Sequence, residues 1–303
     1  MSKPPEIPHG LVGQLPTTHR ITGLPFYPQV EDQCGPASLA TMLSARGLQV
    51  SPESLRGKIY IPGKEGTLTT EMVARARRYG MLVYPLRPEL ADIFIEISAG
   101  NPVLVMQNLG FDWLPRWHFS IVTGYDLDRE LVVLRSGHKA YREVGFDLFL
   151  KTWERALRWA VVINRPDQLP ATADESSYIA AASELELVDE LAAALMAYET
   201  AMTRWPTSGQ AYFGVGNTAY AMGQFDRARE MYSAYVEMRP SAAAGWNNLA
   251  YSLMRLRCRT ESLQALNCAL QLEPGNPAFL DSRRELSAQT ESVSTVFCRV
   301  PRC

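Results

Sequence analysis

The chain has 303 residues, of which 47% are hydrophobic, so it can form two ordinary domains with their own cores. Its formal net charge is −2 and it contains no block of basic residues, which disfavours nucleic acid or an anionic membrane as its main partner. No apolar run is long enough to span a membrane, and the first twenty residues hold four prolines. We therefore expect neither a transmembrane segment nor a signal peptide.

Short strand-like runs and helix-like segments alternate between residue 20 and about residue 165. Runs rich in β-branched and aromatic residues predict strands at 81–86, 102–107, 118–125, 131–136 and 159–164. Apolar periodicity predicts helices at 36–46, 67–79, 88–98 and 146–156. This order predicts an α+β domain whose strands lie in one sheet.

The polar sequence DLDR (126–129) predicts a turn that joins the two flanking strands into a hairpin. If Tyr125 pairs near Glu130, regular antiparallel pairing puts His118 opposite residues 136–138.

From about residue 175 the chain becomes helical, rich in alanine and repetitive. Three prolines stand 34 residues apart, each preceded by a small residue twelve positions earlier and a larger one eight positions earlier. The prolines are Pro206, Pro240 and Pro274, the small residues Ala194, Ala228 and Ser262, and the larger ones Tyr198, Tyr232 and Leu266. A 34-residue helix–turn–helix unit of this kind is the tetratricopeptide pattern. The first unit is degenerate, and the third has Arg257 where a turn glycine is expected.

These patterns divide the chain into five parts, with one more helix at about 276–289 as a cap on the repeats. They are an N-terminal arm (1–21), the α+β domain (22–165), a linker (166–174), the all-α repeat domain with its capping helix (175–289) and a C-terminal tail (290–303).

Stacked repeats leave a concave groove that can hold a peptide or protein partner. The candidates for this partner groove are Phe213, Asn217, Tyr220, Asn247, Tyr251 and Met254. The alternative, that some of them pack between repeats instead, stays open.

Five cysteines occur, at spacings that fit no zinc site: Cys34, Cys258, Cys268, Cys298 and Cys303. Neither a metal-ligand cluster nor a phosphate loop is present in the sequence, so no metal or organic cofactor is expected. Cys298 and Cys303 share the C-terminal tail and could pair with each other in an oxidising compartment.

Cys34 lies in the sequence PQVEDQCGPASLA (28–40), and a helix is expected to begin just after it. Pro36 suits the first turn of a helix, and Gly47 suits its end. A helix N-terminus favours a thiolate and lowers the pKa of a cysteine, so Cys34 is a candidate nucleophile. The alternative is a small buried residue at a loop–helix junction.

His118 is the candidate base for such a nucleophile. His9 and His19 lie in the Pro-rich arm, whereas His118 begins the apolar run HFSIVTGY and shares a strand face with Ser120. The alternative is a structural histidine at a strand edge.

An oxyanion formed during acyl transfer needs hydrogen-bond donors. The N–H of Cys34 is one donor, and Gln29, one short loop earlier, is favoured over Gln33 as the second. Gln33 and Trp117 are candidates for substrate contact, and Trp113 and Phe119 are further possible walls of the cleft.

The sequences FYPQVEDQCGPASLATML and WHFSIVTGYD together resemble the peptidase domain that trims double-glycine leaders from bacteriocin precursors. The resemblance implies a papain-like fold over roughly residues 22–163, with Cys34 as nucleophile, His118 as base and Gln29 as oxyanion glutamine. The whole chain resembles bacterial cysteine peptidases that carry this domain followed by tetratricopeptide repeats. Members of that group are commonly envelope lipoproteins, which implies the cell envelope or periplasm; the cytoplasm is the alternative location.

The chain departs from the family at the third catalytic position. An aspartate at the end of the second hairpin strand orients the histidine in the leader peptidases, and Ser136 stands there in this chain. A neutral third member suffices in Cys-His-Asn sites, because the orienting group mainly fixes the ring. Asp126 is a weaker candidate, since it lies at the far end of the strand.

These residues predict a cysteine peptidase whose repeats recruit a peptide or protein substrate. The first alternative is a catalytically inactive peptidase-like scaffold that binds peptides through its repeats, which Ser136 favours. The second is acyl transfer to an amine by the same residues.

Overall fold

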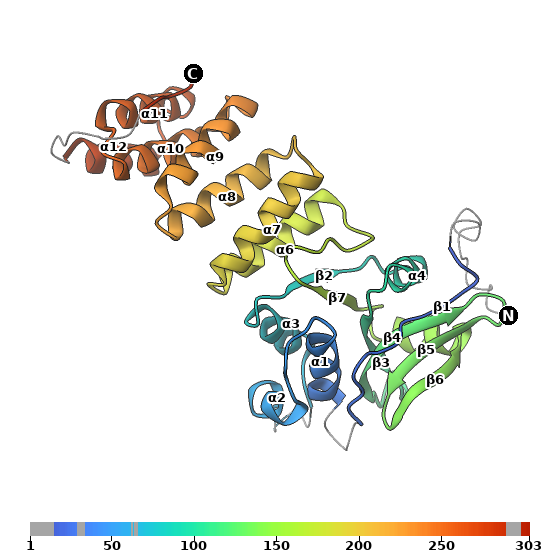
Figure 1. Ribbon diagram of the computed structural model, residues 1–303. Helices are drawn as coiled ribbons and strands as arrows, with labels where there is room; N and C mark the ends of the chain where they lie inside the picture. The colour runs from blue at the N-terminus through green and yellow to red at the C-terminus, as the bar shows by residue number, and fades with distance from the viewer. Residues whose placement is uncertain (1–14, 29–33, 62, 64–65, 289–297) are drawn as a thin grey trace. The chain divides into compact units, whose positions relative to one another are not determined.

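The antiparallel sheet of the N-terminal unit is formed by seven strands among the described residues, which are 15–28, 34–61, 63, 66–288 and 298–303 of this computed structural model (Figure 1). The strands are β1 (Thr18–Arg20), β2 (Leu82–Pro85), β3 (Val103–Asn108), β4 (Trp117–Asp126), β5 (Leu131–Ser136), β6 (Lys139–Gly145) and β7 (Ala160–Asn164). Their order is β2-β7-β3-β4-β5-β6, and β1 pairs with the end of β4. All five predicted strands are confirmed.

Helices cover the sheet and supply its core. They are α1 (Cys34–Ser44), α2 (Pro52–Ile59), α3 (Thr69–Arg77), α4 (Leu90–Ser98) and α5 (Phe146–Glu154). Buried residues of α1, α2 and α3 form one cluster with Leu104 of β3 and with Phe119 and Ile121 of β4. On the opposite face of β3, Gln107 Nε2 donates to Thr152 Oγ1 of α5 at 2.8 Å. All four predicted helices are confirmed, so the α+β prediction is confirmed as well.

The hairpin of β4 and β5 has the predicted strands but a different register at its turn. Tyr125 pairs with Val132, so the prediction that it pairs near Glu130 is wrong. Glu130 instead lies in the turn, with a positive φ of 51°. A bulge between Val122 and Gly124 then shifts the register by one residue, and Ile121 pairs with Arg135. Because of this shift, Ser136 still lies beside His118, as predicted.

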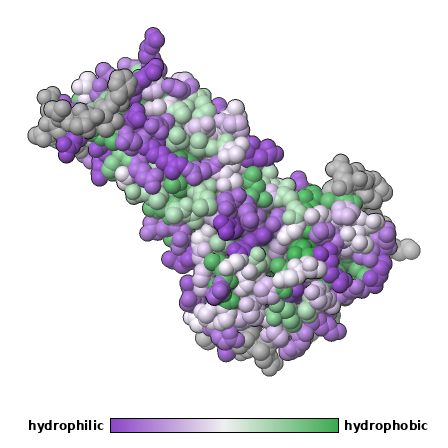
Figure 2. Space-filling model, in the orientation of Figure 1, coloured by the Kyte–Doolittle hydropathy of each residue, from purple (hydrophilic) through white to green (hydrophobic). Residues whose placement is uncertain are grey.

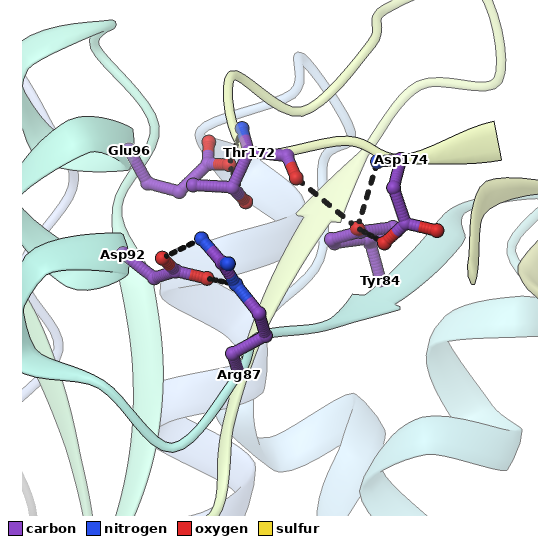
Figure 3. A network of polar contacts seen from close by, with 6 residues as sticks. All are labelled: Tyr84, Arg87, Asp92, Glu96, Thr172 and Asp174. Atoms are coloured by element: carbon purple, nitrogen blue, oxygen red, sulfur yellow. Dashed lines mark hydrogen bonds and ion pairs between the residues drawn. The ribbon is translucent and has the colours of Figure 1, made fainter. Parts of the chain in front are cut away.

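The segment predicted as a linker (166–174) is held on the N-terminal unit by two polar side chains (Figure 3). The fully buried Glu96 of α4 accepts hydrogen bonds from Ala171 N at 3.1 Å and from Thr172 N and Oγ1 at 2.8 and 2.6 Å. Tyr84 of β2 donates through its hydroxyl to Thr172 O and to Asp174 at 3.2 and 3.1 Å. Charge-assisted bonds of this kind stabilise the segment because the buried carboxylate has full partners there.

The second compact unit begins at Ala182 and consists of helical pairs. From α6, which crosses the unit boundary, the helices are α6 (Glu175–Leu187), α7 (Leu191–Arg204), α8 (Gly209–Ala221), α9 (Phe225–Met238), α10 (Ala243–Arg255), α11 (Arg259–Leu272) and α12 (Pro277–Ala288). The predicted small residues Ala194, Ala228 and Ser262 are fully buried. The repeat prediction and its capping helix, α12, are therefore confirmed.

Small residues allow close crossing of the repeat helices. A Cβ atom added to Gly214 would lie 2.5 Å from the Tyr198 ring, and one added to Gly216 would lie 2.6 Å from the Tyr232 ring. The rings of Tyr198 in α7 and Tyr232 in α9 therefore pack directly on the backbone of α8, where a larger residue than glycine would not fit.

Two disulfides tie the end of the chain to the last repeat. Cys258 pairs with Cys298, and Cys268 pairs with Cys303, with Cα–Cα distances of 5.8 and 5.7 Å. The predicted pairing of Cys298 with Cys303 is wrong. Both tail cysteines instead find buried partners at the start and middle of α11, because the tail packs on the core of the last repeat through Cys298 and Val300. Cys34 lies outside both disulfides.

Hydrophilic and hydrophobic residues are interspersed over the visible face of the molecule (Figure 2), as is usual for the surface of a globular protein. None of the helices that the structure describes has the length and apolar character needed to cross a bilayer.

The turn between the two helices of each repeat contains one residue in the left-handed backbone conformation. Gly223 has a positive φ of 75°, and the equivalent positions, Asp189 and Arg257, have φ values of 64° and 66°. Left-handed backbone costs a non-glycine residue about 1 kcal/mol. We expect Arg257→Gly to raise the free energy of unfolding by about 1 kcal/mol, as measured by chemical denaturation.

Arg239→Gly is the matched control, because Arg239 ends α9 with a φ of −134°. Glycine gives no strain relief there and adds chain entropy to the unfolded state. An equal gain of stability in both variants would contradict this explanation.

Candidate functional site

The first part of the candidate site is the start of α1, where Cys34 is the first helical residue. Pro36 lies in the first turn, where its missing N–H is not needed. Leu39, Met42 and Leu43 are fully buried in the cluster that also contains Phe119, and the half-buried Cys34 packs against the same cluster. Cys34 therefore lies at the N-terminal end of a helix, the position that the sequence analysis expected for it.

Gly35 lets a second segment approach this helix start. A Cβ atom at position 35 would lie 2.5 Å from Thr67 Oγ1 and 2.6 Å from Thr67 Cβ. Any side chain at this position would therefore push apart the backbone that carries Cys34 and the segment just before α3. The glycine after the cysteine thus has a packing role that is independent of turn geometry.

The second part of the site is His118, the second residue of β4. Its Nε2 is 2.8 Å from Ser136 Oγ at the end of β5, and Ser136 is 5% exposed. The pairing of Ile121 with Arg135 brings these two side chains to the same face of the hairpin. Because Nε2 is used in this contact, Nδ1 is the nitrogen that would act on a nucleophile.

The surroundings of His118 disfavour its charged form. Burial is the main cause that lowers the pKa of His118 from 6.5 to about 4, and the nearby charges of Arg142 and Arg116 contribute to the same shift. His118 is therefore neutral at pH 7 and can accept a proton there.

The remaining predicted residues of this site fall into three groups. Gln29 and Gln33 lie outside the described residues. Trp117 begins β4 and is 55% exposed, whereas Phe119 is buried in the core and forms no cleft wall. Asp126 lies at the other end of β4 and accepts a hydrogen bond from Arg129 N, so it is not near His118. The pairing of Cys34 with His118 and the oxyanion role of Gln29 stay predictions.

The candidates for the partner groove have contacts within the repeats. Asn217 Oδ1 accepts from Tyr232 Oη at 2.7 Å and from Asn248 Nδ2 at 3.2 Å. Tyr251 Oη donates to Glu285 at 2.7 Å, and the Tyr220 ring packs on Phe225 at 5.3 Å.

Asn247 differs from these residues because its Oδ1 is buried without a hydrogen-bond partner in the described part of the chain. Phe213 and Met254 pack on the repeat core, so packing describes them better than ligand contact. The partner-binding role of Asn217, Tyr220, Asn247 and Tyr251 stays a prediction.

Sequence reasoning did not identify Arg116 and Arg142 as residues near His118. Arg116 could have been found, because it stands two positions before His118 and shares its strand face. Arg142 could not, because its place depends on β6, a strand that the sequence analysis did not predict.

Comparisons with known proteins support both halves of the sequence interpretation. Residues 21–161 match the model of the Peptidase_C39 like family, and residues 215–277 match a tetratricopeptide repeat model. Protein FlbA of Caulobacter vibrioides is 28% identical over 115 residues; the match covers 38% of this chain and 18% of that protein. The chain thus spans less than a fifth of this curated relative.

Solved structures show similarity to each half separately. A putative C39-like peptidase from Bacillus anthracis is 17% identical with a TM-score of 0.41, covering 48% of this chain and 96% of that one. The peptidase domain of Streptococcus ComA is 19% identical with a TM-score of 0.37, covering 47% and 98%. The first tetratricopeptide domain of Spaghetti (RPAP3), bound to an HSP90 peptide, is 15% identical with a TM-score of 0.36, covering 37% and 90%.

The lowered pKa of His118 predicts how stability changes with pH. The unfolded chain takes up the histidine proton near pH 6.5 and the folded chain only near pH 4, so folded stability falls as the pH drops through this window. The shift corresponds to a loss on the order of 3 kcal/mol. We expect His118→Gln to lose less stability than the wild type between pH 7.5 and pH 4.5, as measured by urea denaturation.

The exposed His138→Gln variant is the matched control for loss of an imidazole. Equal losses of stability in the wild type and in His118→Gln would show that burial of His118 does not disfavour its charged form.

Proposed function

We propose that this chain, which carries a Peptidase_C39-like domain followed by tetratricopeptide repeats, is a cysteine peptidase. It cleaves a peptide or protein substrate with Cys34 as the nucleophile and His118 as the base. The observation that carries this proposal is the contact of His118 Nε2 with Ser136 Oγ at 2.8 Å. It supports the proposal because it holds the imidazole ring through Nε2 and leaves Nδ1 for the thiol, which is the division of roles that a thiol–imidazole site needs.

The proposed reaction has two steps. His118 takes the proton of the Cys34 thiol, and the thiolate attacks the carbonyl carbon of the scissile peptide bond. The Cys34 N–H and Gln29 stabilise the negative oxygen of the tetrahedral intermediate. The C–N bond then breaks, and the leaving amine takes the proton from His118. Water hydrolyses the resulting thioester, with His118 again as the base.

Ser136 supports this chemistry because it orients the His118 ring, although it supplies no negative charge. Its hydroxyl is buried at the end of β5 and holds the ring through a neutral hydrogen bond. A thiol needs less help from an orienting group than a serine hydroxyl does, because its own pKa of about 8.5 is far closer to neutrality.

The repeats are proposed to recruit the substrate or a partner. A peptide bound to one unit is confined near the other, which raises its effective concentration without a new contact at the thiol. The match of residues 215–277 to a tetratricopeptide repeat model supports this role.

A second candidate function is a peptide-binding scaffold without catalysis. The neutral Ser136 and the lowered pKa of His118 favour it, because both weaken the stabilisation of an imidazolium.

The proposed location is the bacterial cell envelope. The two disulfides support it, because such bonds persist in oxidising compartments and are rare in a reducing cytosol.

The substitution Cys34→Ala separates the two candidate functions. The variant can be used to trap peptides from the native host, and the trapped peptides then serve as substrates for the wild type. We expect wild-type cleavage and a loss in kcat/KM of at least about a thousandfold in Cys34→Ala, because no other residue replaces the nucleophile. Ser54→Ala, which changes an exposed serine, is the control for any effect of preparing a variant protein as such.

Equal cleavage by the wild type and Cys34→Ala would exclude the peptidase proposal. Retention of the same peptides by both proteins, with no cleavage by either, would support the scaffold instead.

The substitution of Ser136 tests the role of the orienting group. We expect Ser136→Ala to lower kcat about tenfold with little change in KM, because the ring loses its orientation but the substrate contacts remain. Ser136→Asp is expected to retain or exceed wild-type kcat, since a carboxylate also stabilises the imidazolium. A kcat unchanged in Ser136→Ala would show that the contact with His118 has no part in catalysis.

A further inference from the structure

Two arginines lie on the strand face that carries His118. Leu109 N donates to Arg116 O at 2.9 Å, which extends the pairing of β3 and β4 one residue before Trp117. Arg116 and His118 are two residues apart along this extended segment, so their side chains lie on the same face.

Arg142 reaches the same face from β6. Val122 of β4 pairs with Leu134 of β5, and Leu134 pairs with Arg142. Paired residues of neighbouring strands lie on one face of a sheet, and Val122 shares its face with His118. Arg116 thus precedes His118 by two residues, and Arg142 lies across β5 from Val122, four residues after His118, on the same face. Both arginines are exposed, and the charge of each acts on His118.

Neither arginine has an acidic partner in the part of the chain that the structure describes. Three other arginines of the same unit do have one: Arg87 pairs with Asp92, Arg129 with Glu143, and Arg155 with Asp112. A pair of cations beside a base that must become positive disfavours that base. An anion bound at this place would remove the penalty.

On the basis of the peptidase function proposed above, we propose that Arg116 and Arg142 bind a carboxylate of the substrate beside the scissile bond, so that the preferred substrates are acidic peptides. Arginine suits this role because its planar group binds a carboxylate through two parallel hydrogen bonds. The substrate then brings the negative charge that Ser136 does not supply.

This arrangement also links substrate binding to the proton on His118. The pKa of His118 is lowered by burial and by the two arginines, and a bound carboxylate would move it back toward its ordinary value. Among the described residues, the groups that interact with His118 are Ser136, through a hydrogen bond, and Arg116 and Arg142, through their charges. None of these is acidic, so the carboxylate must come from the substrate.

The test compares two reagents that alkylate Cys34 by the same displacement of iodide. Iodoacetate carries a carboxylate, and iodoacetamide is neutral and of nearly the same size. We expect the ratio of the iodoacetate rate to the iodoacetamide rate to exceed that of a small free thiol about threefold to tenfold, because one charge interaction near the surface is worth about 1 kcal/mol. The ratio should fall to the free-thiol value in the double variant Arg116→Gln with Arg142→Gln.

Two controls isolate the charge and its place. Arg129→Gln removes an exposed arginine at the other end of the β4–β5 hairpin and should leave the ratio unchanged. Arg116→Lys with Arg142→Lys keeps both charges but not the two parallel hydrogen bonds, so its ratio should lie between those of the wild type and the double Gln variant. An unchanged ratio in the double Gln variant would overturn the proposal.

Peptide cleavage separates this proposal from the proposed function. Two peptides that differ only by Asp or Asn next to the cleaved bond serve as substrates. The wild type should cleave the Asp peptide with a kcat/KM at least about fivefold higher, whereas the double Gln variant should cleave both with similar kcat/KM. Cleavage of both peptides at equal rates would overturn the arginine proposal and leave the peptidase standing. A third outcome is that no trapped peptide is cleaved but the alkylation ratio still depends on the two arginines. That result would exclude the peptidase function and leave an acidic peptide as a ligand of the site.

Discussion

The hydrogen bond between His118 and Ser136 depends on the pairing of β4 with β5, and the candidate site depends on that bond. A bulge in β4 corrects the register of the hairpin by one residue, so that Ser136 lies beside the imidazole and not one position beyond it. A slip by one residue would turn the hydroxyl to the other face of the sheet. The same strand carries Phe119, which packs on the core beneath α1, so the helix that begins at Cys34 rests on the strand that carries His118.

The electrostatics of the site follow from this geometry. Burial keeps His118 neutral, the neutral Ser136 does not oppose this effect, and two arginines reinforce it. A site of this kind holds its base ready to accept a proton but stabilises the charged product weakly. Either the chain tolerates this weakness as a slow or specialised peptidase, or it binds peptides without cutting them. The acidic-substrate proposal would reconcile this weakness with catalysis, because the bound ligand would supply the missing negative charge.

The sequence predicted those features that depend on local pattern. The alternation in HFSIVTGY predicted β4, the Cys-Gly-Pro sequence predicted the start of α1, and the 34-residue period predicted the repeats. Features that depend on contacts between distant segments were missed or wrong. β6 is a largely exposed edge strand with no apolar alternation, so neither it nor Arg142 was expected. The disulfides join cysteines 40 and 35 residues apart, and only the packing of the tail on α11 selects those pairs.

The most direct measurement of the central claim is the rate at which iodoacetamide modifies Cys34 at pH 7 in the wild type and in His118→Ala. If His118 acts as the base for Cys34, the wild-type thiol reacts at least about tenfold faster than a small free thiol, and the variant loses most of that advantage. A wild-type rate equal to that of the free thiol, unchanged by His118→Ala, would contradict the claim that these two residues form a catalytic pair.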